Sequence, residues 1–257
     1  MDLKEQNWNN FCAKHLNDWH GIWTIYSPSR EVTDTFQCVR SFRSNSEQTE
    51  ITHTNRYTYA DGRTEEKTWQ LYKPSLRSIF FEQGAGAYNS KQLEPGSLFA
   101  VELFFRHEDI RHSVVAAYQD GSNLTSMLSI REDAASLSKF WSSDLNLTAE
   151  RKLGGNWIGT RQTMTPDLKV SPALPTQLNW AIEGNETFFF PDGISLSCPG
   201  KVKVGMAIAI AVNWLVNPTY MQQVTIKYDE LGAFHNLTLE QFHLSDINSA
   251  RIETTYI

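Results

Sequence analysis

The sequence has little of what anchors a protein to a membrane or to a nucleic acid. No apolar run is long enough to cross a bilayer, because the longest, Met206 to Val212, has the length of a single strand. The N-terminus shows neither the basic start nor the apolar stretch of a signal peptide. The net charge is −6 at pH 7, and Lys and Arg form no stripe that would bind a polyanion. We therefore expect a cytoplasmic protein with no membrane span and no nucleic-acid partner.

Cysteine is scarce as well, and the familiar metal and cofactor motifs are missing. Cys12, Cys38 and Cys198 are odd in number and widely spaced, which favours reduced thiols over a disulfide framework. The run from His107 to His112 has one residue too many for a zinc-binding His-Glu-x-x-His motif, and it falls on strands and a turn. No P-loop, dinucleotide fingerprint or Ser-His-Asp arrangement is present. We expect neither a metal nor a cofactor.

Aromatic residues are plentiful, at 12% of the sequence, and most of the chain has the pattern of β-strands. Apolar residues recur at spacings of three and four from Trp8 to Trp19, which predicts a short N-terminal helix. Beyond Gly21, residues alternate at period two between turns such as Asp61-Gly62 and Asp120-Gly121. Regularly spaced strands with no helices between them indicate an all-β barrel or sandwich.

An internal repeat divides the chain in two. Gly21-Ile-Trp23 opens a strand near the start, and Gly155-Asn-Trp157 opens another in the second half. The span from Trp23 to Tyr118 is 95 residues and that from Trp157 to Tyr228 is 71. The second copy is thus 24 residues shorter, about the length of two strands and their turn. We predict two tandem antiparallel barrels, over residues 1–145 and 146–257, the second of them reduced.

Four stretches together resemble a cyanobacterial calycin-like (lipocalin-like) family of unknown function, and the likeness covers nearly the whole chain. They are Asn17-Asp-Trp-His-Gly-Ile-Trp, Thr54-Asn-Arg-Tyr-Thr-Tyr-Ala-Asp-Gly-Arg, Phe104-Phe-Arg-His-Glu-Asp-Ile-Arg-His and Phe188-Phe-Phe-Pro-Asp-Gly-Ile-Ser-Leu. That family is a distant relative of the S- and T-type phycobiliprotein lyases, which are barrels that hold a linear tetrapyrrole. The resemblance implies two calycin-like barrels that favour apolar, often conjugated ligands, and it carries over no catalytic residue.

The resemblance also implies a packing pair in each barrel, a Trp on the first strand covered by an Arg from a late strand. In the first barrel the matching residues are Trp23 and Arg131. In the second barrel Trp157 matches, but the late position holds Gln241, so the likeness is weaker there.

Polar residues in phase with an apolar strand face mark the candidate site, because barrel strands alternate inward and outward. Arg40 shares a face with Phe36 and Phe42 and is predicted to point inward. A buried guanidinium is costly unless it is paired. Arg40 would therefore meet either a ligand carboxylate or a carboxylate of the protein, unless it lies at the barrel mouth. Glu82 and Glu102 are candidate counter-ions of Arg40 or general bases, and a surface location is the favoured alternative for both.

The strand after Arg40 places His53, Asn55 and Tyr57 on one face. These groups could orient a ligand carbonyl or, through His53, move a proton near neutral pH. A structural ladder of hydrogen-bonded polar groups is the alternative. Trp69 completes the ligand-binding candidates on this side of the barrel.

Phe105 and His112 are the candidates from the opposite side of the first barrel. Each lies in phase with an apolar set on its strand and is predicted to face the interior. The inward set of the second barrel is more apolar, so we expect side chains to fill that interior. The ligand site is accordingly predicted in the first barrel.

Three functions remain open. A binding protein would hold an apolar or conjugated small molecule in the first barrel, with Arg40 and the strand of His53, Asn55 and Tyr57 fixing its polar end. A cofactor-independent enzyme would cyclise, isomerise or attach such a molecule, with His53 or His112 moving protons and Arg40 stabilising negative charge. A protein–protein module would bind another protein, such as a phycobiliprotein, in the groove between solid barrels. A carrier and an enzyme need the same pocket, so the sequence does not separate them.

Overall fold

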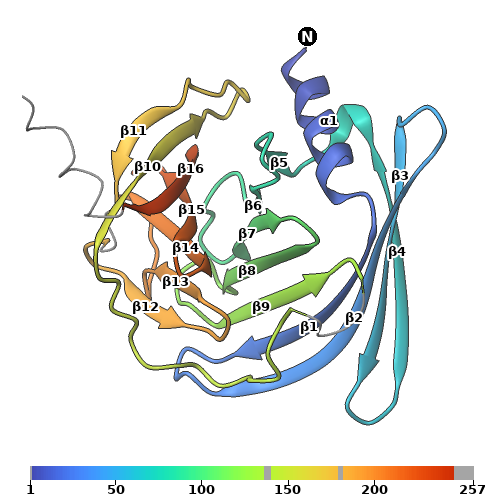
Figure 1. Cartoon of the computed structure of the whole chain (residues 1–257), viewed down its shortest axis with the longest axis horizontal. Helices are drawn as coiled ribbons and strands as arrows, with labels where there is room; N and C mark the ends of the chain where they lie inside the picture. The colour runs from blue at the N-terminus through green and yellow to red at the C-terminus, as the bar shows by residue number, and fades with distance from the viewer. Residues whose placement is uncertain (1, 136–139, 179–181, 246–257) are drawn as a thin grey trace, which may run out of the picture.

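The chain folds mainly into antiparallel strands, preceded by one N-terminal helix. A computed structural model describes residues 2–135, 140–178 and 182–245. Within these residues the helical elements are α1 (Leu3–His15) and a short 3-10 helix, η1 (Lys73–Ser75) (Figure 1). The predicted all-β class with a short N-terminal helix is therefore confirmed.

The strands form two curled sheets (Figure 1). The N-terminal sheet has nine strands in the order β4-β3-β2-β1-β9-β8-β7-β6-β5, with bounds β1 (Asp18–Tyr26), β2 (Val32–Ser44), β3 (Glu50–Tyr59), β4 (Thr64–Tyr72), β5 (Ile79–Phe80), β6 (Gly86–Asn89), β7 (Phe99–His107), β8 (Ile110–Tyr118) and β9 (Ser126–Asp133). The C-terminal sheet has seven in the order β11-β10-β16-β15-β14-β13-β12, with bounds β10 (Asn156–Met164), β11 (Leu174–Gln177), β12 (Glu186–Phe189), β13 (Ile194–Cys198), β14 (Ile208–Asn217), β15 (Tyr220–Tyr228) and β16 (Phe234–Ser245). Among the described strands neither sheet closes into a ring, so the two barrels are open half-barrels.

The two sheets share one topology. In each, the first strand lies between the second strand and the last, as β1 does between β2 and β9 and β10 does between β11 and β16. From the last strand the order then runs backwards along the chain in both sheets. The strands without a counterpart in the C-terminal sheet are β3 and β4, which explains why the second copy of the repeat is shorter by two strands.

The glycine at the start of the first repeat is required by a close approach between strands. A Cβ added to Gly21 on β1 would lie 2.6 Å from the Cγ atom of Glu132 and 2.9 Å from the carbonyl oxygen of Arg131, both on β9. Any larger side chain would therefore push these two strands apart. Gly155 serves a different purpose, because its φ of 86° places it in the left-handed region just before β10.

Helix α1 ends earlier than the spacing of apolar residues predicts. It ends at His15, and Trp19 already belongs to β1, where it pairs with Arg40 of β2. The Trp19 indole Nε1 donates a hydrogen bond to the carbonyl oxygen of His15 at 2.8 Å, which satisfies a carbonyl at the end of the helix. Among the described residues no helix has both the length and the apolar character needed to cross a membrane.

Helix α1 is anchored on one face of the N-terminal sheet. Its Trp8 and Phe11 are buried in a cluster with Phe42 and Phe80. Asn7 adds polar contacts, because its Oδ1 accepts a hydrogen bond from the backbone amide of Phe80 at 2.7 Å. The helix therefore covers this side of the sheet, which we call the cavity face and which carries Arg40, Phe42 and Phe104 among others.

The opposite face of the N-terminal sheet, which we call the core face, packs against the C-terminal sheet. One hydrophobic core contains Phe99, Val101, Leu103, Phe105 and Val114 from the N-terminal sheet and Phe188, Leu196, Val212, Trp214, Val224 and Ile226 from the C-terminal sheet. The two half-barrels therefore share a core instead of each enclosing its own.

The apolar set of the C-terminal sheet points into this shared core, which differs from the predicted filling of a second barrel interior. Its other face carries a cross-strand row of polar residues, Ser195, Asn213, Gln223 and Glu240, all buried. Side chains alternate between the two faces of a strand. The apolar side chains of the C-terminal sheet therefore face the N-terminal sheet, and the polar ones face away from it.

The segment between the sheets is tied to both. The N-terminal sheet ends at Asp133 and the C-terminal sheet begins at Asn156. The Tyr26 hydroxyl donates to the carbonyl oxygen of Leu145 at 2.6 Å. The predicted domain boundary after residue 145 falls in this segment and stays a prediction, and the end of the predicted second domain, beyond residue 245, lies outside the described residues.

Candidate functional site

A cavity of about 620 Å³ lies on the cavity face of the N-terminal sheet. Strands β2, β3 and β4 form one wall, and α1 with the segment around η1 forms another. The aromatic side chains that line it are Phe11, Trp23, Phe42, Tyr57, Trp69, Tyr72, Phe80, Tyr88 and Phe104. The polar ones include His15, Arg40, His53, Asn55, Glu102 and Arg111. Its volume is that of a pocket for a small organic molecule.

Five of the seven predicted ligand-binding residues line this cavity. They are Arg40, His53, Asn55, Tyr57 and Trp69. The structure brings them together because β2, β3 and β4 are neighbouring strands. Arg40 on β2 lies opposite Asn55 on β3, and His53 on β3 lies opposite Trp69 on β4. Strands β3 and β4 have no counterpart in the C-terminal sheet, so that sheet has no equivalent wall.

The other two predicted residues, Phe105 and His112, lie on the core face and do not line the cavity. The His112 ring stacks on Phe105 at a centroid distance of 4.6 Å and meets Trp214 of the C-terminal sheet edge-on at 4.7 Å. Neither His112 ring nitrogen has a hydrogen-bond partner among the described residues. Burial, with a contribution from Arg131, holds the pKa of His112 well below its usual value, so the ring is neutral.

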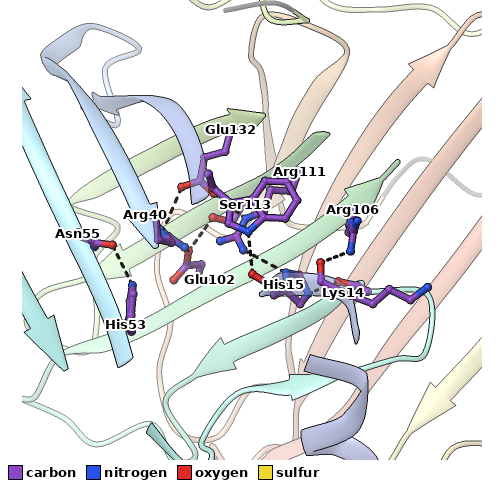
Figure 2. Close-up of polar contacts among 12 residues, drawn as sticks. Lys14, His15, Arg40, His53, Asn55, Glu102, Arg106, Arg111, Ser113 and Glu132 are labelled. Atoms are coloured by element: carbon purple, nitrogen blue, oxygen red, sulfur yellow. Dashed lines mark hydrogen bonds and ion pairs between the residues drawn. The ribbon is translucent and has the colours of Figure 1, made fainter. Parts of the chain in front are cut away.

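His53, Asn55 and Tyr57 form a directed chain of hydrogen bonds along β3. His53 Nε2 lies 2.9 Å from Asn55 Oδ1 (Figure 2), and because an amide oxygen accepts, Nε2 carries the ring proton. Asn55 Nδ2 in turn donates to the Tyr57 hydroxyl oxygen at 2.8 Å. The hydrogen-bonded ladder that was the alternative for these residues is therefore present, and the hydroxyl proton of Tyr57 is not used within it.

The ring of His53 is held between two aromatic side chains. It stacks on Phe42 at a centroid distance of 4.4 Å and lies 5.0 Å from the ring of Trp69. Burial, and next the charge of Arg40, lower the pKa of His53 to about 3. The imidazole is thus neutral at physiological pH and is a weak base.

Arg40 meets carboxylates of the protein, one of the two predicted pairings. Its Nε lies 3.3 Å from Glu132 Oε1, and its Nη1 lies 3.7 Å from Glu102 Oε1 (Figure 2). Burial lowers the pKa of Arg40, but the charges of Glu132 and Glu102, with smaller contributions from Cys38 and Tyr57, leave it raised overall. The guanidinium carbon also lies 4.5 Å from the ring centroid of Trp23, which is a cation–π contact.

The ion pairs continue beneath the cavity to α1 (Figure 2). Arg111 Nε donates to Glu132 Oε2 at 2.7 Å, and Arg111 Nη1 lies 3.1 Å from His15 Nδ1. His15 Nε2 lies 3.0 Å from the carbonyl oxygen of Gly84, so Nε2 carries the proton and Nδ1 accepts from Arg111. Burial is the main cause that lowers the pKa of His15 well below its usual value, and Arg111 adds to it.

Glu132, Arg111 and His15 are site residues that the sequence reasoning missed. A signal existed for Glu132, because it alternates in phase with Leu128 and Ile130, which line the cavity. No comparable signal marked His15, since its contact with Arg111 joins residues 96 positions apart.

The pairing of Trp23 with Arg131 that the resemblance implied is not present. Trp23 lies on the cavity face, where Arg40 covers it. Arg131 points to the other side of β9, where it forms an ion pair with Asp192 of the C-terminal half and donates to the carbonyl oxygen of Asp144 at 2.9 Å. The reason is that successive residues of a strand point to opposite faces. Ile130 on β9 is the partner of Trp23, so Arg131, the next residue, points to the face opposite Trp23.

The cavity offers no evident place for a metal ion. Within residues 2–135, 140–178 and 182–245, no three His, Cys, Asp or Glu side chains gather as metal ligands. The cysteines Cys12, Cys38 and Cys198 are buried and unpaired. The polar groups of the cavity are instead suited to hydrogen bonds with an organic molecule.

The fold and the cavity define an antiparallel double half-barrel whose N-terminal sheet carries a small-molecule-sized pocket. The chain belongs to the DUF3598 family, since residues 4–137 match the model described as the N-terminal part of a domain of unknown function (DUF3598). Residues 183–242 match the C-terminal domain of biogenesis factor required for ATP synthase 1.

A solved structure supports the fold. The crystal structure of a DUF3598-family protein of unknown function from Nostoc punctiforme superposes with a TM-score of 0.76 and is 19% identical. The match covers 93% of this chain and 99% of that one. No curated protein matches the sequence.

Proposed function

We propose that the N-terminal half-barrel binds an apolar or conjugated small molecule in its cavity. The observation that carries this proposal is a pocket of about 620 Å³ whose walls are rich in aromatic side chains and also carry convergent polar groups. Pockets of this size and lining are typical of small-molecule sites. The likeness to calycin-like barrels that favour conjugated ligands supports the same ligand class.

The aromatic walls favour a flat ring system as the ligand. His53 is already stacked on Phe42 and lies against Trp69, whose side chain remains 42% exposed. An exposed Trp next to a pocket is an incomplete aromatic stack. A planar ligand would extend it and bury apolar surface at the same time.

Binding is better supported than acid–base catalysis. His53 has a pKa of about 3 and is a poor acceptor for a proton at neutral pH. His112 lies on the core face, away from the cavity. Arg40 is committed to Glu102 and Glu132, so its charge is compensated before a ligand arrives. Cyclisation, isomerisation or chromophore attachment would need a stronger base than this cavity provides.

The test is a titration of the purified protein with the neutral fluorophore N-phenyl-1-naphthylamine. We expect saturable binding with one site, seen as enhanced probe fluorescence and quenched tryptophan fluorescence. Val115 lines the cavity, so Val115→Trp places a much larger side chain in it and should weaken binding. Val204→Trp adds the same side chain at an exposed site and should leave binding unchanged. Urea unfolding of both variants checks that they fold.

Two results would contradict the proposal: no saturable uptake by the unaltered protein, or equal uptake by the Val115→Trp variant. The first would show that the cavity takes no such ligand. The second would show that the probe binds elsewhere on the surface.

A second candidate function is contact with another protein, and it rests on the match of residues 183–242. The matched domain belongs to a factor whose name states that it is required for biogenesis of an ATP synthase. A corresponding role would make this chain a partner of ATP synthase subunits. Co-expression with the ATP synthase subunits of the source organism, followed by size-exclusion chromatography, tests this. Elution of every subunit without this chain would rule the role out.

A further inference from the structure

The charged groups at the buried end of the cavity balance one another, whereas a third lining arginine, Arg77, is exposed two residues after η1. Arg40 and Arg111 contribute two positive charges, and Glu102 and Glu132 contribute two negative ones. Glu132 bridges the two guanidinium groups and its side chain is fully buried beneath them. The buried end of the cavity therefore has no uncompensated charge for an ionic ligand to neutralise.

Glu102 differs from Glu132 in facing the cavity. Its side chain is 17% exposed, and it is the only acid among the described residues that line the cavity. The Ser113 hydroxyl donates to Glu102 Oε1 at 2.7 Å, which fixes the carboxylate (Figure 2). A ligand group that reaches the Arg40 guanidinium from the cavity must therefore come close to this carboxylate.

A charged ligand group placed at this buried end would be penalised whichever its sign. An anion placed against Arg40 is repelled by Glu102, and repulsion between charges a few ångströms apart is strong where water is largely excluded. A cation placed against Glu102 is repelled by Arg40 and Arg111. An uncharged group escapes both penalties.

The hydrogen-bond chain on β3 offers such a group a donor. Tyr57 accepts from Asn55, so its own proton remains free for an acceptor in the cavity. The opposite end of the chain, His53, is neutral and offers Nδ1 as an acceptor because Nε2 carries the proton. A hydroxyl or carbonyl substituent on a ring would satisfy these groups.

We propose that the cavity selects an uncharged aromatic compound with a hydroxyl or carbonyl substituent, and that Glu102 sets this selectivity by rejecting anions. This inference rests on the proposed function, because it specifies the ligand class of the same cavity. Tyr57 supplies the hydrogen bond that distinguishes the substituted ring from the bare hydrocarbon.

Three probes of the same ring size test the inference: naphthalene, 2-naphthol and 2-naphthoate, titrated at pH 7 by isothermal calorimetry or tryptophan quenching. We expect the unaltered protein to bind 2-naphthol about tenfold more tightly than 2-naphthoate, and more tightly than naphthalene. Glu102→Gln keeps the shape of the side chain and removes its charge. It should tighten 2-naphthoate binding about tenfold and leave 2-naphthol within about a factor of two.

Matched variants control for folding and for net charge. Glu94→Gln removes the same charge at an exposed position and should change no affinity. Tyr57→Phe should weaken 2-naphthol binding to about the level of naphthalene. Tyr59→Phe removes the hydroxyl that donates to Glu65 outside the cavity and should have no effect.

The outcomes separate this inference from the proposed function. If none of the three probes binds the unaltered protein, the proposed function itself is contradicted. If the probes bind but Glu102→Gln leaves the ratio of 2-naphthol to 2-naphthoate affinity unchanged, binding stands and the assigned role of Glu102 is overturned. An equal loss of all three probes in Tyr57→Phe would overturn the role of its hydroxyl.

Discussion

Acid is expected to destabilise this protein through its buried histidines between pH 7 and pH 5. Burial holds the pKa values of His15 and His112 well below the usual 6.5, and that of His53 at about 3. A base whose pKa is lowered by folding binds fewer protons in the native state than in the unfolded state. Its stabilising contribution is therefore complete above pH 6.5 and is lost as the pH falls below that value.

The magnitude follows from the width of that window. pH 5 lies 1.5 pH units below the unfolded histidine pKa of 6.5, and each unit corresponds to about 1.36 kcal/mol. Each histidine that stays neutral in the native state therefore lowers the free energy of unfolding at pH 5 by about 2 kcal/mol. His15 and His112 together account for about 4 kcal/mol, and His53 adds to this in the same direction. Domains of ordinary stability unfold with about 5–15 kcal/mol, so the loss is large. Carboxylates contribute little here because their unfolded pKa values lie near 4.

Urea unfolding at pH 7.0 and pH 5.0 measures this loss, and His112→Phe isolates one histidine. His112 makes no hydrogen bond among the described residues and packs on Phe105 and Trp214, so an aromatic replacement can keep the packing. The variant should lose about 2 kcal/mol less than the unaltered protein between the two pH values. His235→Gln, at an exposed position, should lose as much as the unaltered protein. Identical losses in all three proteins would refute the reasoning.

Three further predictions concern stability at pH 7. Glu132→Gln leaves two buried guanidinium groups without their shared carboxylate and should lower the free energy of unfolding by about 3 kcal/mol. A loss under about 1 kcal/mol in a urea titration would contradict this. Gly21→Ala should lower the free energy of unfolding by about 1–3 kcal/mol, because the added carbon pushes β1 away from β9. Gly154→Ala is the control: no atom lies within 4 Å of its added carbon, so the loss should be less than about 0.5 kcal/mol. Because both sheets share one core, fluorescence and far-ultraviolet circular dichroism should report a single coincident unfolding transition, and two separate transitions would show that the halves unfold independently.

Much of the fold could be predicted because it depends on local patterns. Alternation at period two identifies strands, and the repeated Gly-x-Trp motif reveals two related halves. The shorter second copy even predicts the loss of two strands, which the sheet order identifies as the counterparts of β3 and β4. The end of α1 was misplaced because Trp19 continues the helical spacing although it belongs to a strand.

The candidate site was predictable only where one face of a strand is exposed or polar. On β2 and β3 the in-phase set identifies Arg40 and His53 correctly as cavity residues. On β7 and β8 both faces are at least partly covered, one beside the cavity and one against the C-terminal sheet. Alternation then shows that Phe105 and His112 share a face with the apolar residues of their strands, but it does not show whether that face lines the cavity or packs against the C-terminal sheet.

The sequence by itself therefore determined the strands, their repeat and the phase of each side chain along its strand. The tertiary structure decided which phase meets the cavity and which meets the shared core. It also decided that Arg40 and not Arg131 covers Trp23, and that Glu132 joins two arginines. The physical reason is that alternation is a property of one strand, whereas burial and charge pairing depend on which sheet or helix packs against each face.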